Sequence, residues 1–259
     1  MRLKIFKLII LAGLVCYFGI GAALAIFQKE FTYFPDKQDF NDCPDFAVSR
    51  KLDLNGTRAY YQYNSPVLVV FYHGNAGSAC GRAAIKDEIE KNGASYLFVE
   101  YAGYANGKDR FSKDAILKNV RDAANFIAAK NFQKVVVIGE SLGTAPAVYH
   151  STLAKVDRLV LVSPFCKMAE VAQSKYPAYP VSCFLSEDYD NCGLINQSRA
   201  EEFLVVHGKR DAVIPFEQAE KLFRQISSAE KNFVVIDVAG HNDIYGYENA
   251  RQAIFGLGR

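Results

Sequence analysis

Histidine is scarce in this chain, with four residues among 259. Cysteine and histidine show none of the spacings typical of zinc sites, and the chain has no internal repeat or low-complexity tract. A repeat array is therefore excluded, and we expect neither a metal nor an organic cofactor. The net charge is only +2, so we also expect no nucleic-acid partner.

The composition suits one globular domain after a distinct N-terminal segment. Half of the residues are hydrophobic and 22% are charged, which is ordinary for a folded domain of this length. We expect residues 30–259 to form this domain.

Residues 1–29 differ from the rest of the chain. Residues 8–27 carry no charge and are mostly apolar, and as a helix they would span roughly 30 Å, the thickness of a bilayer core. Arg2, Lys4 and Lys7 precede this run and favour a cytoplasmic N-terminus, which places the domain outside the cytoplasm. The alternative is a secretory signal cleaved after Ala25. The apolar run is longer than a usual signal core, which favours a single-pass anchor.

The domain alternates between strand and helix patterns. This order predicts a mostly parallel sheet with helices on both faces. We expect a hairpin and then further strands and helices in turn: strands 48–54, 57–63, 67–72, 96–101, 134–138, 158–162, 203–206 and 233–238, and helices 81–91, 112–130, 142–153, 216–226 and 248–255. The pattern lapses at about 164–197, where prolines and aromatic residues gather, and we expect a small lid insertion there.

A G-x-S-x-G motif, Gly139 to Gly143, follows the predicted strand 134–138. Glycines at these positions allow a sharp turn from strand into helix, and the turn lifts the serine hydroxyl clear of the sheet. Ser141 is therefore the candidate nucleophile for acyl transfer.

A serine nucleophile needs a base, and in this type of fold the order is serine, acid, histidine. Among the histidines, only His241 follows a strand with a carboxylate placed between it and the serine. Asp211, after the predicted strand 203–206, is the favoured carboxylate and would orient His241. Asp188, Asp190 and Asp243 are weaker candidates for the acid. We expect His73 to brace its own loop.

An oxyanion intermediate needs fixed donors. We expect the backbone N–H of Leu142, which follows the nucleophile, to be one of them. The glycine-containing loop after strand 67–72 should supply the other, and Asn75 N–H is our choice.

Six cysteines are present, and their pairing stays open. Cys183 and Cys192 bracket a loop and would pair in an oxidising compartment, with Cys43 as another possible partner. Free buried thiols are an equal alternative.

Several motifs in their order resemble the α/β-hydrolase superfamily, and most closely its membrane-anchored ABHD-type serine hydrolases. The matching segments are 71–77, 100–104, 139–144, 163–165, 207–211 with 213–215, and 240–243. The resemblance implies a Ser141–Asp211–His241 triad and an oxyanion hole at Asn75 and Leu142. One departure is at Ala105, where relatives often carry a glycine.

The expected function is that of a serine hydrolase cleaving carboxylic esters or thioesters through an acyl-enzyme. By the resemblance, and because of the membrane segment and the aromatic insertion, we expect acyl-lipid substrates. Two alternatives remain: a serine peptidase with the same triad, and a non-catalytic membrane-anchored scaffold.

Overall fold

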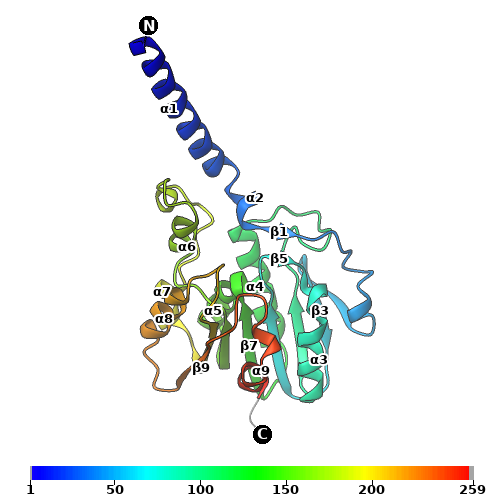
Figure 1. Cartoon of the computed structure of the whole chain (residues 1–259). Coiled ribbons are helices and arrows are strands. Elements are labelled where there is room, and N and C mark those ends of the chain that lie inside the picture. The colour runs from blue at the N-terminus through cyan, green and yellow to red at the C-terminus, as the bar shows by residue number, and fades with distance from the viewer. Residues whose placement is uncertain (1, 257–259) are drawn as a thin grey trace.

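The computed structural model describes residues 2–256, and a mostly parallel eight-stranded sheet forms the centre of the molecule (Figure 1). The strands lie in the order β10-β9-β8-β7-β4-β6-β3-β2. Their bounds are β2 (Arg50–Leu54), β3 (Thr57–Gln62), β4 (Val67–Tyr72), β6 (Ser95–Val99), β7 (Lys134–Glu140), β8 (Val156–Val162), β9 (Ala200–Gly208) and β10 (Lys231–Ile236). The predicted fold class is confirmed.

The strands from β10 to β6 run parallel, and only β2 and β3 run antiparallel to their neighbours. The predicted hairpin joins β2 to β3 through Asn55 and Gly56, whose φ angles are 56° and 90°. The parallel strands end at one edge of the sheet. Every segment that follows such a strand therefore begins at this edge.

Helices cover both faces of the sheet because alternate residues of the central strands point to opposite sides. In β4, Leu68 and Val70 belong to one core, whereas Val69 and Phe71 belong to the other. The first core includes side chains of α4 (Lys113–Ala128), α5 (Thr144–Leu153) and α8 (Phe216–Gln225), and the second includes side chains of α3 (Ala83–Lys91) and α9 (Glu248–Phe255).

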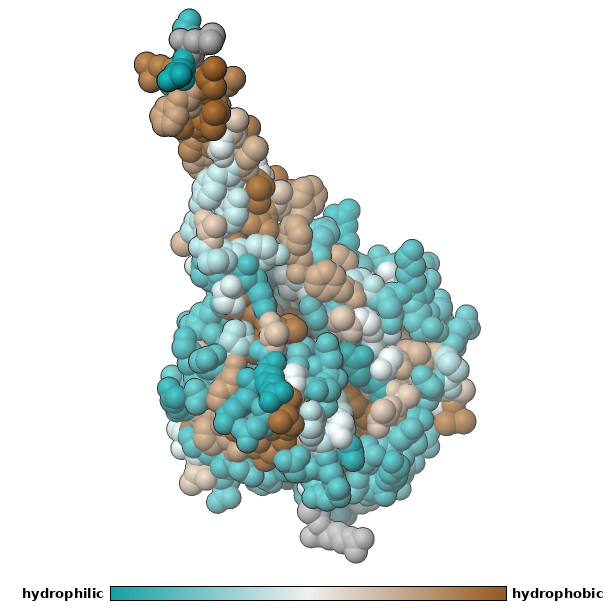
Figure 2. All heavy atoms as spheres, viewed as in Figure 1, coloured by the Kyte–Doolittle hydropathy of each residue, from teal (hydrophilic) through white to brown (hydrophobic). Residues whose placement is uncertain are grey.

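The N-terminal helix α1 (Arg2–Ile26) projects away from the body (Figure 1). It is long and apolar enough to cross a membrane, and most of its large apolar side chains are exposed. Figure 2 shows apolar surface on this helix and around its junction with the body, which is mostly hydrophilic below. A short helix, α2 (Gln28–Thr32), and strand β1 (Phe34–Pro35) connect it to the domain.

The insertion at about 164–197 is more regular than its sequence predicts. It contains α6 (Met168–Lys175), α7 (Asn191–Leu194) and two short 3-10 turns. A β-bridge between Lys167 and Asp190 brings the two ends of the insertion together.

Of the alternatives that the sequence leaves open, the pairing of Cys183 with Cys192 is wrong. Cys192 pairs with Cys166, because the bridge at the base of the insertion places them opposite each other, with Cα atoms 5.0 Å apart. Cys183 is exposed and free.

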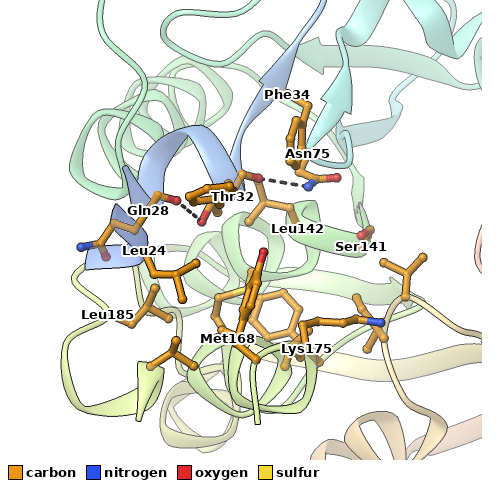
Figure 3. A pocket seen from close by; sticks show the side chains of 18 of the residues that line it. Leu24, Gln28, Thr32, Phe34, Asn75, Ser141, Leu142, Met168, Lys175 and Leu185 are labelled. Atoms are coloured by element: carbon orange, nitrogen blue, oxygen red, sulfur yellow. Dashed lines mark hydrogen bonds between the residues drawn. The ribbon is translucent and has the colours of Figure 1, made fainter. Parts of the chain in front are cut away.

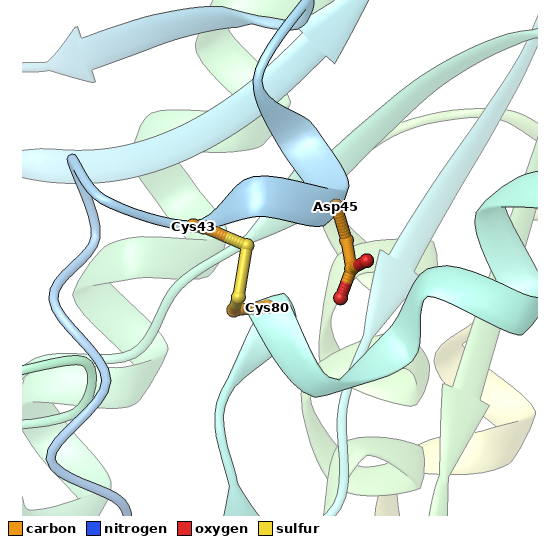
Figure 4. Close-up of side chains that lie close together, drawn as sticks. All are labelled: Cys43, Asp45 and Cys80. Carbon is orange, nitrogen blue, oxygen red and sulfur yellow. A yellow bond between two sulfur atoms is a disulfide. The ribbon is translucent and has the colours of Figure 1, made fainter.

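Cys43 pairs with Cys80, with Cα atoms 5.8 Å apart, and this disulfide fastens the segment before β2 to the 3-10 turn η2 (Ala79–Arg82) (Figure 4). Asp45 lies beside it. Both thiols are consumed by the disulfide, so this trio offers no thiolate to a metal.

Candidate active site

Ser141 lies where β7 turns into α5, through the 3-10 turn η3 (Ser141–Gly143). Its φ angle is 53°, a left-handed conformation that costs free energy for a residue with a side chain. The neighbouring glycines make room for this turn. A Cβ atom at Gly143 would lie 2.1 Å from the carbonyl oxygen of Tyr72, and one at Gly139 would lie 2.4 Å from that of Gly143.

The structure brings Ser141, His241 and Asp211 into one hydrogen-bonded line. His241 Nε2 lies 3.0 Å from Ser141 Oγ, and His241 Nδ1 lies 2.7 Å from Asp211 Oδ2. A carboxylate only accepts, so Nδ1 carries the proton and Nε2 accepts from the serine hydroxyl. Asp211 follows β9 and His241 follows β10, at the edge where Ser141 lies.

The Asp211 carboxylate is buried and held as an anion. Burial acts to raise its pKa, but hydrogen bonds from His207 and His241 and from the backbone N–H of Ile214 lower that pKa well below its ordinary value. The backbone N–H groups of Val213 and Ile214 both donate to Oδ1, each at 2.8 Å. Asp211 is therefore ionised throughout the range in which proteins usually work.

Asn75 and Leu142 line the same cavity as Ser141. The side-chain amide of Asn75 donates to the backbone carbonyl of Thr32 at 3.0 Å. The backbone carbonyl of Asn75 accepts from Phe34 N–H, also at 3.0 Å. These bonds fix the loop after β4. Leu142 lies just before α5, where the helix dipole adds positive field. Their roles as oxyanion donors stay predictions.

That cavity has a volume of about 250 Å³ and a mostly apolar lining. Figure 3 shows Ser141 on one side of it and Leu24 and Leu185 on the other, with Met168 between. The lining thus comes from the elbow, from the insertion and from the N-terminal helix. Such a lining suits an apolar group better than a polar one.

A second cavity, of about 620 Å³, is lined in part by His241. Its lining is more polar and includes Arg82, Glu140 and Arg251. The Arg82 guanidinium donates to Glu140 at 2.9 Å, so the carboxylate of the residue before Ser141 is held in an ion pair.

The other histidines are buried. His73 Nε2 lies 3.1 Å from Glu100 Oε1, and its Nδ1 lies 2.8 Å from the Gly74 carbonyl, so His73 is held within the loop that the sequence led us to expect it to brace. His150 Nδ1 lies 2.7 Å from the Tyr72 hydroxyl, in the core.

The sequence did not lead us to assign a role to His207, which lies beside Asp211. Its Nε2 lies 3.3 Å from Asp211 Oδ2 and 3.1 Å from the carbonyl of Ile214. The signal that would have found it is the i, i+4 spacing of His207 and Asp211 at the end of one strand.

Comparison with known proteins finds relatives without an assigned activity. No family model matches. A Mycobacterium tuberculosis protein described as uncharacterized protein Rv2307c is 31% identical over 178 residues, which cover 68% of this chain and 63% of that protein. Escherichia coli YfhR, also described as uncharacterized, is 24% identical over 83% of this chain and 80% of its own length. A Saccharomyces cerevisiae relative, 25% identical over 70% of this chain and 66% of its own, is described as a membrane protein.

Solved structures show the fold. An esterase of Pyrococcus furiosus superposes with a TM-score of 0.67 at 16% identity, over 87% of this chain and 96% of its own. A monoacylglycerol lipase of Paleococcus ferrophilus gives 0.60 at 15% identity, over 78% and 98%. Mouse alpha/beta hydrolase domain-containing protein 10 gives 0.57 at 13% identity, over 80% and 95%. This chain therefore has the α/β-hydrolase fold.

Proposed function

We propose that this α/β-hydrolase chain is a serine hydrolase that cleaves carboxylic esters or thioesters, with acyl lipids as its substrates. The observation that carries the proposal is the line from Ser141 Oγ through His241 to Asp211, with distances of 3.0 and 2.7 Å. Solved structures of the same fold include esterases and a lipase, which supports hydrolysis as the reaction.

The reaction proceeds through an acyl-enzyme. His241 Nε2 accepts the hydroxyl proton as Ser141 Oγ forms a bond to the acyl carbonyl carbon. The resulting oxyanion accepts hydrogen bonds from the N–H groups of Asn75 and Leu142. The imidazolium, stabilised by Asp211, then gives its proton to the departing alcohol or thiol as the carbonyl re-forms.

Deacylation repeats these steps with water as the nucleophile. His241 takes a proton from a water molecule, whose oxygen attacks the acyl carbon. The proton then returns to Ser141 as the carboxylic acid leaves. His241 takes up and releases the proton in each of these transfers.

The two cavities suggest how the substrate is oriented. The apolar cavity contacts Ser141 and Leu142 and would hold the acyl chain. The second cavity, the more polar of the two, contacts His241, which protonates the leaving group, and would hold the alcohol or thiol portion. A long acyl chain on a polar leaving group matches this division.

Residues 1–29 would form a single-pass anchor and residues 30–259 the catalytic domain, with the lid at about 164–197. Basic residues before the apolar run favour a domain outside the cytoplasm, and the two disulfides suit an oxidising compartment.

Hydrolysis of p-nitrophenyl esters from two to sixteen carbons tests the reaction and the substrate class. Ser141→Ala should abolish hydrolysis of every ester. Ser163→Ala is the matched control, because Ser163 is also buried just after a strand and has a positive φ of 48°. Equal or lower activity on every longer chain would contradict the lipid assignment. No Ser141-dependent hydrolysis of any ester would favour the scaffold, and faster cleavage of amides would favour a peptidase.

A further inference from the structure

We infer that α1 is a wall of the acyl site as well as an anchor, and that the substrate is a long acyl chain drawn from the bilayer beside it. This inference rests on the proposed hydrolase function. In this inference the acyl chain of the substrate comes from the membrane, and α1 helps to select it.

The apolar cavity extends from the nucleophile to the root of the N-terminal helix. Its lining includes Leu24 in the last turn of α1 and Gln28 and Phe31 in α2. Figure 3 shows Leu24 across the cavity from Ser141. Leu24 is 7% exposed, whereas most residues of α1 are exposed. An anchor that served only as a tether would have no need to bury a side chain in the active-site cavity.

The insertion is fastened to the same helix. The Tyr17 hydroxyl donates to the carbonyl of Ala178 at 2.7 Å, and the Tyr17 ring stacks on Tyr179 with centroids 4.7 Å apart. One turn further on, Gly21 packs against the Tyr179 ring, which lies 3.4 Å from where a Cβ atom would be. The insertion and α1 thus close the cavity together.

The tip of the insertion is suited to lie in the bilayer. Residues 176–185 carry no charge, and most of the tip is exposed, including Tyr176. Tyr17, which contacts the tip, lies ten residues before the end of the apolar run at Phe27, and this corresponds to about 15 Å of helix. If α1 spans the membrane, the tip beside Tyr17 lies within the hydrocarbon.

Exposed aromatic side chains surround the junction. Phe27, Phe31 and Phe34 are each about half exposed, and the Phe31 ring lies 6.5 Å from that of Tyr176. Figure 2 shows apolar surface at this junction. Exposed phenylalanine side chains are typical of a surface that lies at the boundary between headgroups and acyl chains. Phe31 and Phe34 also line the cavity, so this part of it lies at the level where the acyl chains of a lipid begin.

The junction also supports the predicted oxyanion loop. Strand β1 pairs with β5 (Ala76–Gly77) in parallel, and Phe34 N–H donates to the carbonyl of Asn75.

Cleavage after Ala25 would remove Leu24 and Tyr17 and open the cavity. The structure thus favours a retained helix over a cleaved signal.

Filling the far end of the cavity tests its role. In the full chain reconstituted in nanodiscs, Leu24→Trp should lower the ratio of kcat/KM for the sixteen-carbon ester to that for the acetate by at least tenfold. Leu24→Ala should keep the long-chain activity. The matched control is Leu14→Trp on the exposed part of α1, which should leave both rates unchanged. An unchanged ratio in Leu24→Trp would overturn the inference, whereas Ser141-dependent hydrolysis in the wild type tests the proposed function separately.

The absence of tryptophan from the chain allows a direct test of depth. Tyr179→Trp places one fluorophore at the tip, and lipids brominated in their acyl chains should quench it strongly. Tyr63→Trp is the control, because Tyr63 is exposed just after β3, where that strand ends opposite the start of β6. Equal, weak quenching in both variants would overturn the assignment of the tip to the bilayer.

Discussion

The imidazole of His207 lies 3.3 Å from the carboxylate of Asp211, measured from Nε2 to Oδ2. The same Nε2 lies 3.1 Å from the carbonyl of Ile214. A carbonyl and a carboxylate both accept, so Nε2 carries a proton and points it between them. Asp211 Oδ2 thus lies within reach of two imidazoles, and only His241 also reaches Ser141.

Because His207 stabilises the Asp211 anion, we expect it to act as a positioning residue. His207→Phe removes the donor and should lower kcat on the order of tenfold, with little change in KM, since a hydrogen bond to a charged group is worth about 1.5–3 kcal/mol. His207→Gln offers a replacement donor and should recover much of the rate. Steady-state kinetics of both variants distinguish the roles. Equal losses of kcat in the two would indicate that His207 only fills space.

Gly143→Ala should disable the elbow. The added Cβ atom would lie 2.1 Å from the carbonyl oxygen of Tyr72, so strand β4 or the turn must move. Overpacking of this kind costs about 1–3 kcal/mol of stability, and a small shift of Ser141 should also lower kcat strongly. The control is Gly246→Ala, where nothing lies within 4 Å of the new atom. Thermal unfolding and ester hydrolysis measure both effects, and an unaltered Gly143→Ala enzyme would contradict the close packing.

Because His150 is buried, we expect the protein to lose stability in acid. Burial lowers its pKa from 6.5 to about 4, so between these values the unfolded chain binds a proton that the folded chain excludes. The contribution of His150 to the free energy of unfolding is complete above the pKa of the unfolded chain and is lost as the pH falls. At pH 5 the loss is about 2 kcal/mol. Unfolding free energies at pH 7.5 and pH 5 measure the change. His150→Gln should show a decrease smaller by about this amount, and an equal decrease in both proteins would refute the assignment.

The Cys166–Cys192 disulfide should hold the insertion over the cavity. It closes a segment with a sequence separation of 26 residues, and such a link stabilises a protein by about 2–4 kcal/mol. Replacing both cysteines with serine should lower the free energy of unfolding by that order and reduce activity on long esters more than on acetate. Cys183→Ser, at an exposed free thiol, should change neither. Identical chain-length profiles for the double variant and the wild type would count against a role of the link in the lid.

The sequence was sufficient for the sheet and the candidate triad because both depend on local pattern. Ser141, Asp211 and His241 each follow a predicted strand, and parallel strands bring the segments after them to one edge. His207 was missed because β9 extends to Gly208, beyond the predicted end at residue 206, so that His207 belongs to the strand and points at the acid. The strand end depends on pairing with β10, which the local pattern does not encode.

Other features depend on contacts between distant segments. The pairing of Cys192 with Cys166 follows from a β-bridge within the insertion, and no spacing rule identifies it. In the sequence, Leu24 is one more apolar residue of the predicted anchor. Only the packing of α1 against the insertion shows that it lines the cavity.

In the proposed mechanism the Ser141 hydroxyl carries the acyl group. Mass spectrometry of the intact full-length protein after treatment with a fluorophosphonate tests this role. We expect one adduct, mapped to the peptide that contains Ser141, absent in Ser141→Ala and present in Ser163→Ala. A folded protein that gains no adduct, or gains it at another serine, would refute Ser141 as the nucleophile.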